Sequence, residues 1–311
     1  MALVALGIEL GYPSVLVFNV VYLSFAAVIF MAERVRPHEQ EWRSSDQQTW
    51  QDLSHTVLTK GVVQVMIVFA GVIGLAEYIS ADGRAPWPVD WPIWAQAILG
   101  MLVAEFGLYW MHRISHEWYP MWRFHALHHS VRRLWFVNTG RFHFMDTVLS
   151  IAAAMPLLIV LGAPTDVFIW VSITTAFVGM LTHANIDMRC GPMNYIFNTP
   201  VLHRWHHSTD LREGNKNYGE VLIVYDLLFG TYVNPDRRPP VEIGIKEAMP
   251  SGFWHQLLAP FWWSRLQRAA KSGKAPELMS RPSFLPPLHT PPSVETEAGE
   301  DQPISAKPAA S

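Results

Sequence analysis

The stretch IWAQAILGMLVAEFGLYWMHRISHEWYPMWRFHALHH, residues 93–129, runs from apolar sequence directly into a cluster of histidines. Residues 93–111 are apolar enough to cross a bilayer, since a helix needs about 20 such residues to span the hydrocarbon core. In HRISH, His112 and His116 are four residues apart, so a helix places both imidazoles on one face. The stretch therefore predicts a membrane helix that ends in a candidate metal site.

The histidine spacing is found in two further strings, HALHH at residues 125–129 and HRWHH at residues 203–207. In each string, the first imidazole lies on the same helical face as the two that follow. His183 ends a later apolar run and can approach the same place from the membrane side. The candidate ligands are His112, His116, His125, His128, His129, His183, His203, His206 and His207. These imidazoles are too many for one ion and suit two.

A single histidine is most often a surface residue or a hydrogen-bonded core residue, and this explanation suffices for His38, His55, His255 and His289. It fails for the three clusters, because packed imidazoles without a common partner leave buried donors and acceptors unsatisfied. A pair of metal ions removes that problem. The single cysteine, Cys190, excludes an intrachain disulfide and a thiolate metal site, so histidine must supply the ligands.

Composition and apolar runs indicate an all-α, multi-pass membrane bundle with a histidine-rich helical cap. Hydrophobic residues make up 50% of the chain and charged residues only 16%, whereas soluble domains contain about 25% charged residues. Apolar runs occur at about residues 12–32, 58–79, 93–111, 147–162 and 165–183. The first three are long enough to span a membrane. The fourth is short and contains Pro156, and only the turn GAPT separates it from the fifth, so these two form either a full hairpin or a re-entrant one.

The distribution of arginine predicts which side of the membrane the histidines face. Arg and Lys in short loops favour the cytoplasm, and Arg is concentrated after the first and third runs. Trp87, Trp91 and Trp94, around the start of the third run, are expected to form an interfacial belt. The amino terminus is therefore expected outside, with residues 112–146 and those from about 184 onward in the cytoplasm. The net charge of −3, without a basic face, gives no indication of a nucleic-acid partner.

The chain divides into four expected segments. They are N-terminal membrane helices at 1–90, a catalytic domain at 91–250, an interfacial amphipathic helix at 251–270 and a disordered tail at 271–311. The third segment mixes Trp and Phe with late basic residues, as interfacial helices do. The fourth is rich in Pro, Ser, Glu and Ala and poor in large apolar residues.

The ligand type alone does not decide the metal, because imidazole suits zinc, copper, iron and nickel. Zinc hydrolases often place a catalytic Glu beside the ligands, as in HExxH, and no Glu is placed that way here. A membrane-embedded site implies an apolar substrate, whose alkyl C–H bonds require a redox metal and O2, hence iron. Two alternatives are a zinc-dependent lipid hydrolase and a metal transporter. A transport site would be expected nearer the middle of the membrane, with acids along a path through the helices.

Several stretches resemble the superfamily of membrane-bound fatty acid hydroxylases and sterol desaturases. They are EFGLYWMHRISHE, MWRFHALHHS, NTGRFHFMD and NYIFNTPVLHRWHHS…NKNYGEVLIVYDLLFGTY, and they lie within about residues 90–235. NYIFNTPVLHRWHH is similar to the alkylglycerol monooxygenase branch. The resemblance implies a helical membrane domain with a cytoplasmic di-iron centre held by the histidines given above. It also implies O2 as co-substrate, a lipid substrate from the bilayer, and electrons from a separate reductase, ferredoxin or cytochrome.

One departure from the family pattern concerns the ligands near His183. Some members carry a second histidine four residues further on, where this chain has Asp187. Asn185, Asp187 or water then completes that iron, or its coordination number is lower. His143 is either a ligand or a hydrogen-bonding neighbour, and we favour the neighbour.

Three acids are candidates to orient the imidazoles, because metal-bound histidines normally donate their other N–H to a carboxylate or carbonyl. Glu105 shares a helical face with His112 and His116, and Asp146 and Asp226 are further candidates. The sequence does not identify the lipid, the residues that bind it, or whether the product is an alcohol or an alkene.

Overall fold

The computed structural model describes residues 2–68, 71, 74–75, 78 and 86–272. Within them the chain is helical, and its extended pairing is limited to two isolated bridges. The all-α class expected from the sequence is therefore confirmed. The predicted disordered tail lies, apart from residues 271 and 272, outside the described residues.

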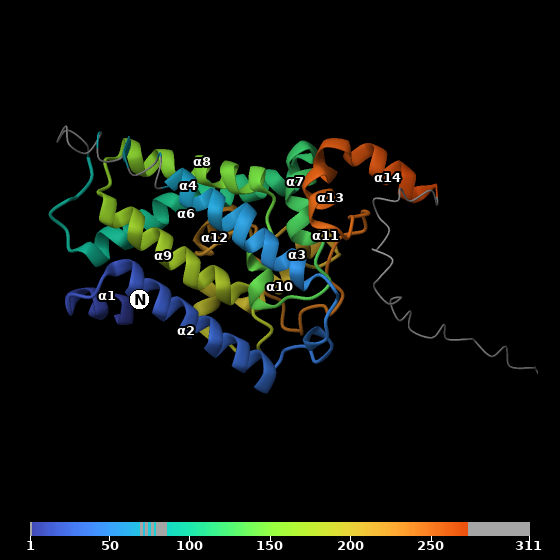
Figure 1. Ribbon diagram of the computed structural model, residues 1–311, viewed down its shortest axis with the longest axis horizontal. Coiled ribbons are helices and arrows are strands. Elements are labelled where there is room, and N and C mark those ends of the chain that lie inside the picture. Colours follow the sequence, from blue (N-terminus) through green and yellow to red (C-terminus); the bar gives the residue numbers. More distant parts are fainter. Residues whose placement is uncertain (1, 69–70, 72–73, 76–77, 79–85, 273–311) are drawn as a thin grey trace, which may run out of the picture. The chain divides into compact units, whose positions relative to one another are not determined.

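Four long helices form the membrane bundle and lie along one direction (Figure 1). They are α2 (Ser14–Val35), α6 (Ile93–Glu117), α8 (Phe144–Val160) and α9 (Thr165–Thr182). Three of these, α2, α6 and α9, are long and apolar enough to cross a membrane, and α8 is a shorter apolar helix. Helix α8 continues through Pro156 and is followed after a short turn by α9.

The second apolar run is only partly described. The run, residues 58–79, starts inside a π-helix, η2 (His55–Val62), which follows α3 (Thr49–Ser54), and it continues into α4 (Val63–Ile67). A short helix, α1 (Ala2–Glu9), precedes α2 and packs against it through Val4, which the sequence analysis did not anticipate.

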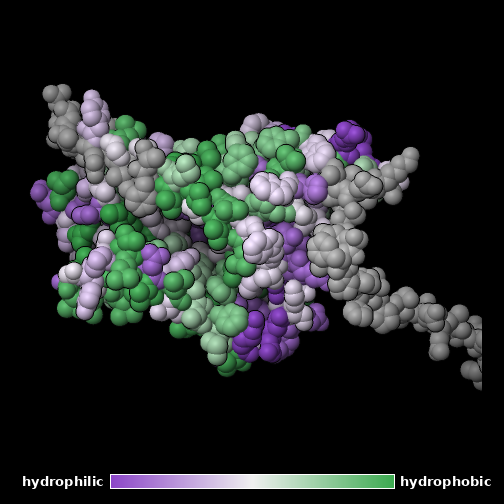
Figure 2. Space-filling model, viewed as in Figure 1, coloured by the Kyte–Doolittle hydropathy of each residue, from purple (hydrophilic) through white to green (hydrophobic). Residues whose placement is uncertain are grey.

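The cap is built from short helices that gather at one end of the bundle (Figure 1). They include α7 (Tyr119–His129), α10 (Pro200–His206), α11 (Leu211–Gly214), α13 (Phe253–Leu258) and α14 (Trp263–Lys271). The remaining elements are η1 (Glu41–Arg43), η4 (Phe136–Gly140), η5 (Gly191–Tyr195), α12 (Val224–Phe229) and η6 (Ala259–Trp262). Figure 2 shows apolar side chains along the long helices and denser polar side chains toward the cap. This division suits a bundle in lipid with its cap in water.

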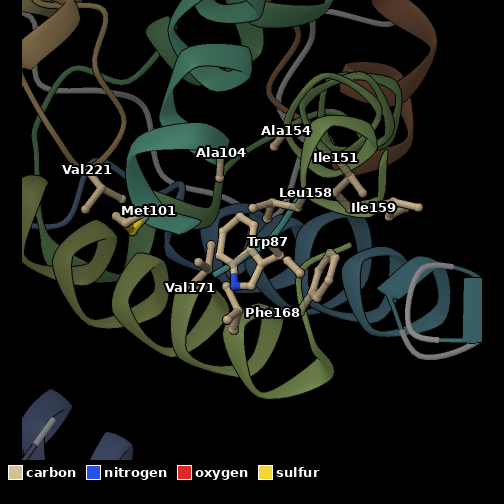
Figure 3. Close-up of a cluster of buried hydrophobic side chains, with 12 residues drawn as sticks. Trp87, Met101, Ala104, Ile151, Ala154, Leu158, Ile159, Phe168, Val171 and Val221 are labelled. Atoms are coloured by element: carbon tan, nitrogen blue, oxygen red, sulfur yellow. The ribbon is translucent and has the colours of Figure 1, made fainter. Parts of the chain in front are cut away.

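The main apolar core joins α6, α8 and α9 around Trp87 (Figure 3). Trp87 is only 5% exposed, and its Nε1 donates to Gln96 Oε1 at 2.9 Å. Trp91 and Trp94 are 52% and 67% exposed. The expected interfacial belt is therefore wrong for Trp87, because its indole fills the core and finds its hydrogen-bond partner there.

Helices α6 and α8 approach closely at Gly107. A Cβ at this position would lie 2.0 Å from the carbonyl oxygen of Ala153, far inside van der Waals contact. Small residues permit such backbone approach between membrane helices. Gly107 is thus fixed by the packing that places the end of α6 against the cap.

We expect Gly107→Ala to destabilise the protein by about 1–3 kcal/mol, the usual cost of overpacking. The matched control is Gly179→Ala in α9, where the nearest atom, Thr139 Oγ1, is 4.0 Å from the added carbon. Thermal unfolding in detergent compares the two. Equal transition temperatures would contradict the packing role assigned to Gly107.

The segment expected as one interfacial helix at 251–270 is divided in the structure. Helix α13 ends at Leu258, η6 contains Pro260, and α14 begins at Trp263. Residues 259–262 form a 3₁₀ turn with Pro260 at its start, where the missing N–H is tolerated, so the α-helix is interrupted there, whereas α8 continues through Pro156. Trp263 packs in a cluster with Ala126 of α7, so this segment supports a helix that carries histidines.

Candidate metal centre

The candidate ligands come from the ends of long helices and from the cap. His112 and His116 lie in the last two turns of α6, and His183 caps the end of α9. Helix α7 carries HALHH, and α10 with its C-cap carries HRWHH. Thr199 starts α10 as its N-cap, with its side chain accepting from the Leu202 N–H.

All the candidate ligands gather in two groups. The first contains His112, His116, His125, His129 and His206, and the second contains His128, His183, His203 and His207. Within each group, one nitrogen of every ring lies within 4.8 Å of the others. The groups adjoin, since the rings of His129 and His207 stack at 4.4 Å between centroids.

The strings HALHH and HRWHH each contribute to both groups, which differs from the single shared face expected. On α7, His125 and His129 enter the first group and His128 enters the second. On α10, the ring of His206 enters the first group, while His203 and His207 enter the second. Successive helical residues diverge by about 100°, so neighbouring imidazoles point to different sides. The two strings thereby join the groups into one centre.

Buried nitrogens without a partner indicate what the site accommodates. The Nε2 atoms of His112, His116 and His206 make no hydrogen bond within the described part of the chain. The same holds for His183 Nε2 and His207 Nδ1. Leaving such groups unsatisfied costs about 1–3 kcal/mol each, and a coordinated metal ion would satisfy them together. The donor set therefore fits a metal in both groups.

The electrostatics of the cluster favour neutral rings. Burial, reinforced by neighbouring imidazoles, lowers the pKa of His129, His203 and His207 well below the ordinary value. Burial also lowers the pKa of His206, to about 3. Neutral imidazole is the form that ligates metals. The cluster is thus prepared to bind cations at neutral pH.

One loop orients three imidazoles of the first group. His112 Nδ1 contacts the Tyr218 carbonyl oxygen at 2.6 Å, and His206 Nδ1 contacts that of Lys216 at 2.7 Å. His116 Nδ1 lies 3.2 Å from Asn215 Oδ1. These contacts leave each Nε2 free to face the interior of the group, as metal-binding histidines require.

Polar side chains orient three further rings, two through an acceptor oxygen and one, that of His203, through an amide N–H donor. His125 Nδ1 contacts Asp146 Oδ2 at 2.8 Å, and His183 Nδ1 contacts Asn138 Oδ1 at 2.8 Å. Asn198 Nδ2 lies 3.2 Å from His203 Nδ1.

Comparison with known proteins agrees with this geometry. Residues 97–231 match the family model of fatty acid hydroxylase. Over 265 residues the chain is 49% identical to ornithine lipid hydroxylase OlsE of Rhizobium tropici, covering 84% of this chain and 80% of that protein. The chain belongs to the fatty acid hydroxylase family.

More distant relatives of this hydroxylase are the alkylglycerol monooxygenases. Identity is 31% over 184 residues with the Xenopus tropicalis protein, covering 57% of this chain and 40% of that one. It is 33% over 147 residues with the Homo sapiens protein, covering 47% and 32% respectively. The hydroxylase thus spans less than half of these two relatives, and no solved structure matches it. The family confirms the resemblance drawn from the sequence, and with it the class of oxygen-dependent lipid hydroxylases, which are oxidoreductases.

The three acids expected beside the imidazoles act in different ways in the hydroxylase. Asp146 contacts His125 directly, as described above. Glu105 instead accepts backbone N–H bonds from residues 220–222, at 2.6, 3.0 and 3.1 Å. Asp226 accepts the N–H groups of Tyr218 and Gly219 at 2.8 and 2.7 Å. Glu105 and Asp226 therefore hold the loop whose carbonyls orient the first group.

The structure places the other candidates outside both groups. His143 Nε2 contacts the Leu257 carbonyl oxygen at 3.0 Å, which is the behaviour of a hydrogen-bonding neighbour and not of a ligand. Asn185 bonds to the backbone of Glu39, and Asp187 forms an exposed ion pair with Arg36 at 3.7 Å. Asn185 and Asp187 do not complete the second group in this structure, because the chain turns away after His183 toward the end of α2.

Apart from Asp146, the polar groups that contact the rings were not among the candidates expected from the sequence. Asn138 and Asn215 begin two of the stretches that resemble the family, but neither was named as a candidate site residue. Asn217, in the NYG segment at residues 217–219, adopts a positive φ of 54°. Its neighbour Tyr218 offers a carbonyl to His112. Every residue carries a carbonyl, so the sequence gives no signal for such an acceptor.

Two cavities reach the centre from different sides. One of about 320 Å³ lies on the cap side and is lined by His116, His129 and His206. The other, of about 150 Å³, is lined by His128, His183 and His203 together with residues of α2, η2 and α9. The first group therefore faces the cap, and the second faces the membrane helices.

Proposed function

We propose that the two histidine groups hold two iron ions and that the enzyme hydroxylates a membrane lipid with O2 and electrons from a separate donor protein. The observation that carries this proposal is the gathering of buried imidazole nitrogens in two adjoining groups. Iron bound there supplies the redox chemistry that allows O2 to oxidise a C–H bond. One oxygen atom enters that bond. The other leaves as water, with a pair of electrons from the donor and a pair of protons.

The protein's own residues provide orientation and shielding. Asp146, Asn138 and the 215–218 loop fix the ring orientations through the unused ring nitrogens. Burial of the cluster keeps bulk water from the reacting atoms. The cavity beside the second group lies toward the membrane helices, the side from which a lipid would approach, and the cavity on the cap side suits a donor in water.

We infer that the substrate is an ornithine lipid or a closely related amino-acid lipid. The support is the identity of 49% with a protein named ornithine lipid hydroxylase, over most of both chains. The relatives named hydroxylase and monooxygenase favour an alcohol product over an alkene. The arginines that follow the first and third apolar runs support a cap in the cytoplasm, with the bundle in the inner membrane.

Metal analysis and lipid mass spectrometry together test this function. We expect about two iron ions per purified chain, and conversion of ornithine lipid to a product heavier by about 16 Da, the mass of one oxygen atom. Chelation should abolish conversion and Fe²⁺ should restore it. Full activity with zinc after iron removal would contradict the proposal and favour a hydrolase. A product lighter by about 2 Da would instead identify a desaturase.

A further inference from the structure

The cavity beside the second histidine group is small and partly polar. Its volume of about 150 Å³ accommodates a group of about six heavy atoms, as a benzene-sized cavity does, rather than a whole acyl chain. Lys60, Gln64 and Glu220 line it, and all three also line an adjoining cavity of about 70 Å³. Lys60 and Glu220 thus place opposite charges in the wall of the cavity next to the candidate ligands.

Lys60 is a cation placed within an apolar run. It lies in η2, and π-helical backbone is rare and often found at functional sites. Its Nζ sits 4.1 Å from the centre of the Phe142 ring, which stacks on the His128 ring at 4.2 Å. Within the described residues, Lys60 has no carboxylate within ion-pair distance. An ionisable residue in a membrane segment marks a functional site by default.

Glu220 supplies the opposite charge. Its backbone N–H is held by Glu105 at 2.6 Å, which fixes the residue at the cavity wall. Its side chain is 24% exposed, and its Oε1 lies 3.7 Å from His112 Nδ1, whose hydrogen bond goes to Tyr218. The carboxylate is therefore left to face the cavity.

Other charged groups near the centre are already engaged. Arg141 pairs with Asp52 at 2.7 Å. Arg204 donates to two backbone carbonyls at 2.7 and 2.8 Å. Asp146 accepts from His125. Lys60 and Glu220 differ from these because they line the cavity and, among the residues that the structure describes, have no ion-pair partner closer than the 3.7 Å between Glu220 and His112.

We propose that Lys60 and Glu220 bind the opposite charges of a zwitterionic lipid head group beside the second histidine group, an inference that rests on the proposed function. Lys60 binds the carboxylate and Glu220 binds the protonated amine. An ornithine acylated on one amine keeps both charged groups. A hydrocarbon chain in the same cavity would leave both protein charges desolvated without compensation, which is costly.

Charge-masked lipids test this assignment. The holoenzyme in neutral detergent is given ornithine lipid, its methyl ester, which lacks the carboxylate charge, or its N-acetyl derivative, which lacks the amine charge. We expect Lys60→Gln to weaken binding of the free acid at least about tenfold while binding of the ester changes little, since hydrogen bonds to charged groups carry such differences. Equilibrium binding is measured without an electron donor, so it compares the free acid and the ester independently of turnover. The values of kcat/KM for the two lipids provide a second comparison.

Conservative and distant variants serve as controls. Lys60→Arg keeps the charge and should keep the preference for the free acid. Lys271→Gln, an exposed lysine at the end of α14, should change nothing. Glu220→Gln should remove the preference for the free amine over the acetylated one, and Glu242→Gln, on the exposed surface, should not.

The outcomes separate this assignment from the proposed function. If the wild-type enzyme does not hydroxylate ornithine lipid, the proposed function fails. If it does so and Lys60→Gln keeps the wild-type ratio of affinities for acid and ester, only the head-group assignment fails. Should Lys60→Gln not fold, equal wild-type affinity for all three lipids would overturn the assignment.

Discussion

Replacing His207 by alanine is expected to remove one of two bound ions and to abolish hydroxylation. His207 belongs to the second group, whose remaining members are His128, His183 and His203. The first group keeps all its imidazoles, so iron per folded chain should fall from about two to about one. Losing a residue that hydrogen-bonds to a metal ligand typically lowers metal affinity or activity by about 10–100-fold. Removing a ligand itself should lower them further. Metal analysis and product mass spectrometry measure both effects, and His128→Ala should behave in the same way.

His143→Asn is the matched control for this loss. His143 is fully buried near the cluster but its ring bonds to the Leu257 carbonyl and caps α8. Asparagine is also a good N-cap, so the start of α8 is retained. Iron content should stay at the wild-type level. Wild-type iron content and product formation in His207→Ala would contradict the ligand assignment, as would loss of iron in His143→Asn alone.

Helical periodicity was sufficient to place these histidines on helices, but not to assign each of them to the first or the second histidine group. An apolar run followed by histidines four residues apart predicted α6 and its end correctly, because one helix fixes both features. In HALHH, the residues at +3 and +4 lie on either side of the first, about 100° apart. Which of them joins which group depends on the position of α10 against α7. That position is a tertiary property, so His128 and His129 could not be separated beforehand.

Positions that the sequence analysis misjudged share a different cause. Trp87 was assigned to the membrane interface from its neighbours, yet it fills the space among α6, α8 and α9. Pro260 breaks the segment expected as one helix, since aromatic and basic content alone does not reveal a kink. Asp187 was one of several alternatives for completing the iron near His183, and in the structure it pairs with Arg36 instead. In each case a local pattern was correct and a longer-range contact decided the outcome.

The second large effect is expected at Glu105. Its carboxylate accepts from three successive backbone N–H groups, two at Oε2 and one at Oε1. In Glu105→Gln the amide oxygen can replace one carboxylate oxygen only, and the NH₂ group then faces a backbone donor. Because hydrogen bonds to charged groups contribute about 1.5–3 kcal/mol each, we expect a loss of about 3 kcal/mol in the free energy of unfolding. Thermal unfolding in detergent measures it.

Glu105→Gln should also disturb the first histidine group, because the loop it holds continues into Tyr218, the acceptor of His112. The affinity of that group for iron should fall by about 10–100-fold, the usual effect of losing a residue that orients a metal ligand. Glu117→Gln is the matched control on the same helix. Its exposed ion pair with Arg113 contributes no more than about 1 kcal/mol, and its contact with the Tyr218 hydroxyl, at 3.5 Å, is at the limit of hydrogen bonding and does not involve the carbonyl that orients His112. If Glu105 were only a structural residue, folded Glu105→Gln would keep wild-type iron affinity. A positioning role instead requires that iron affinity and stability fall together, while Glu117→Gln changes neither by much.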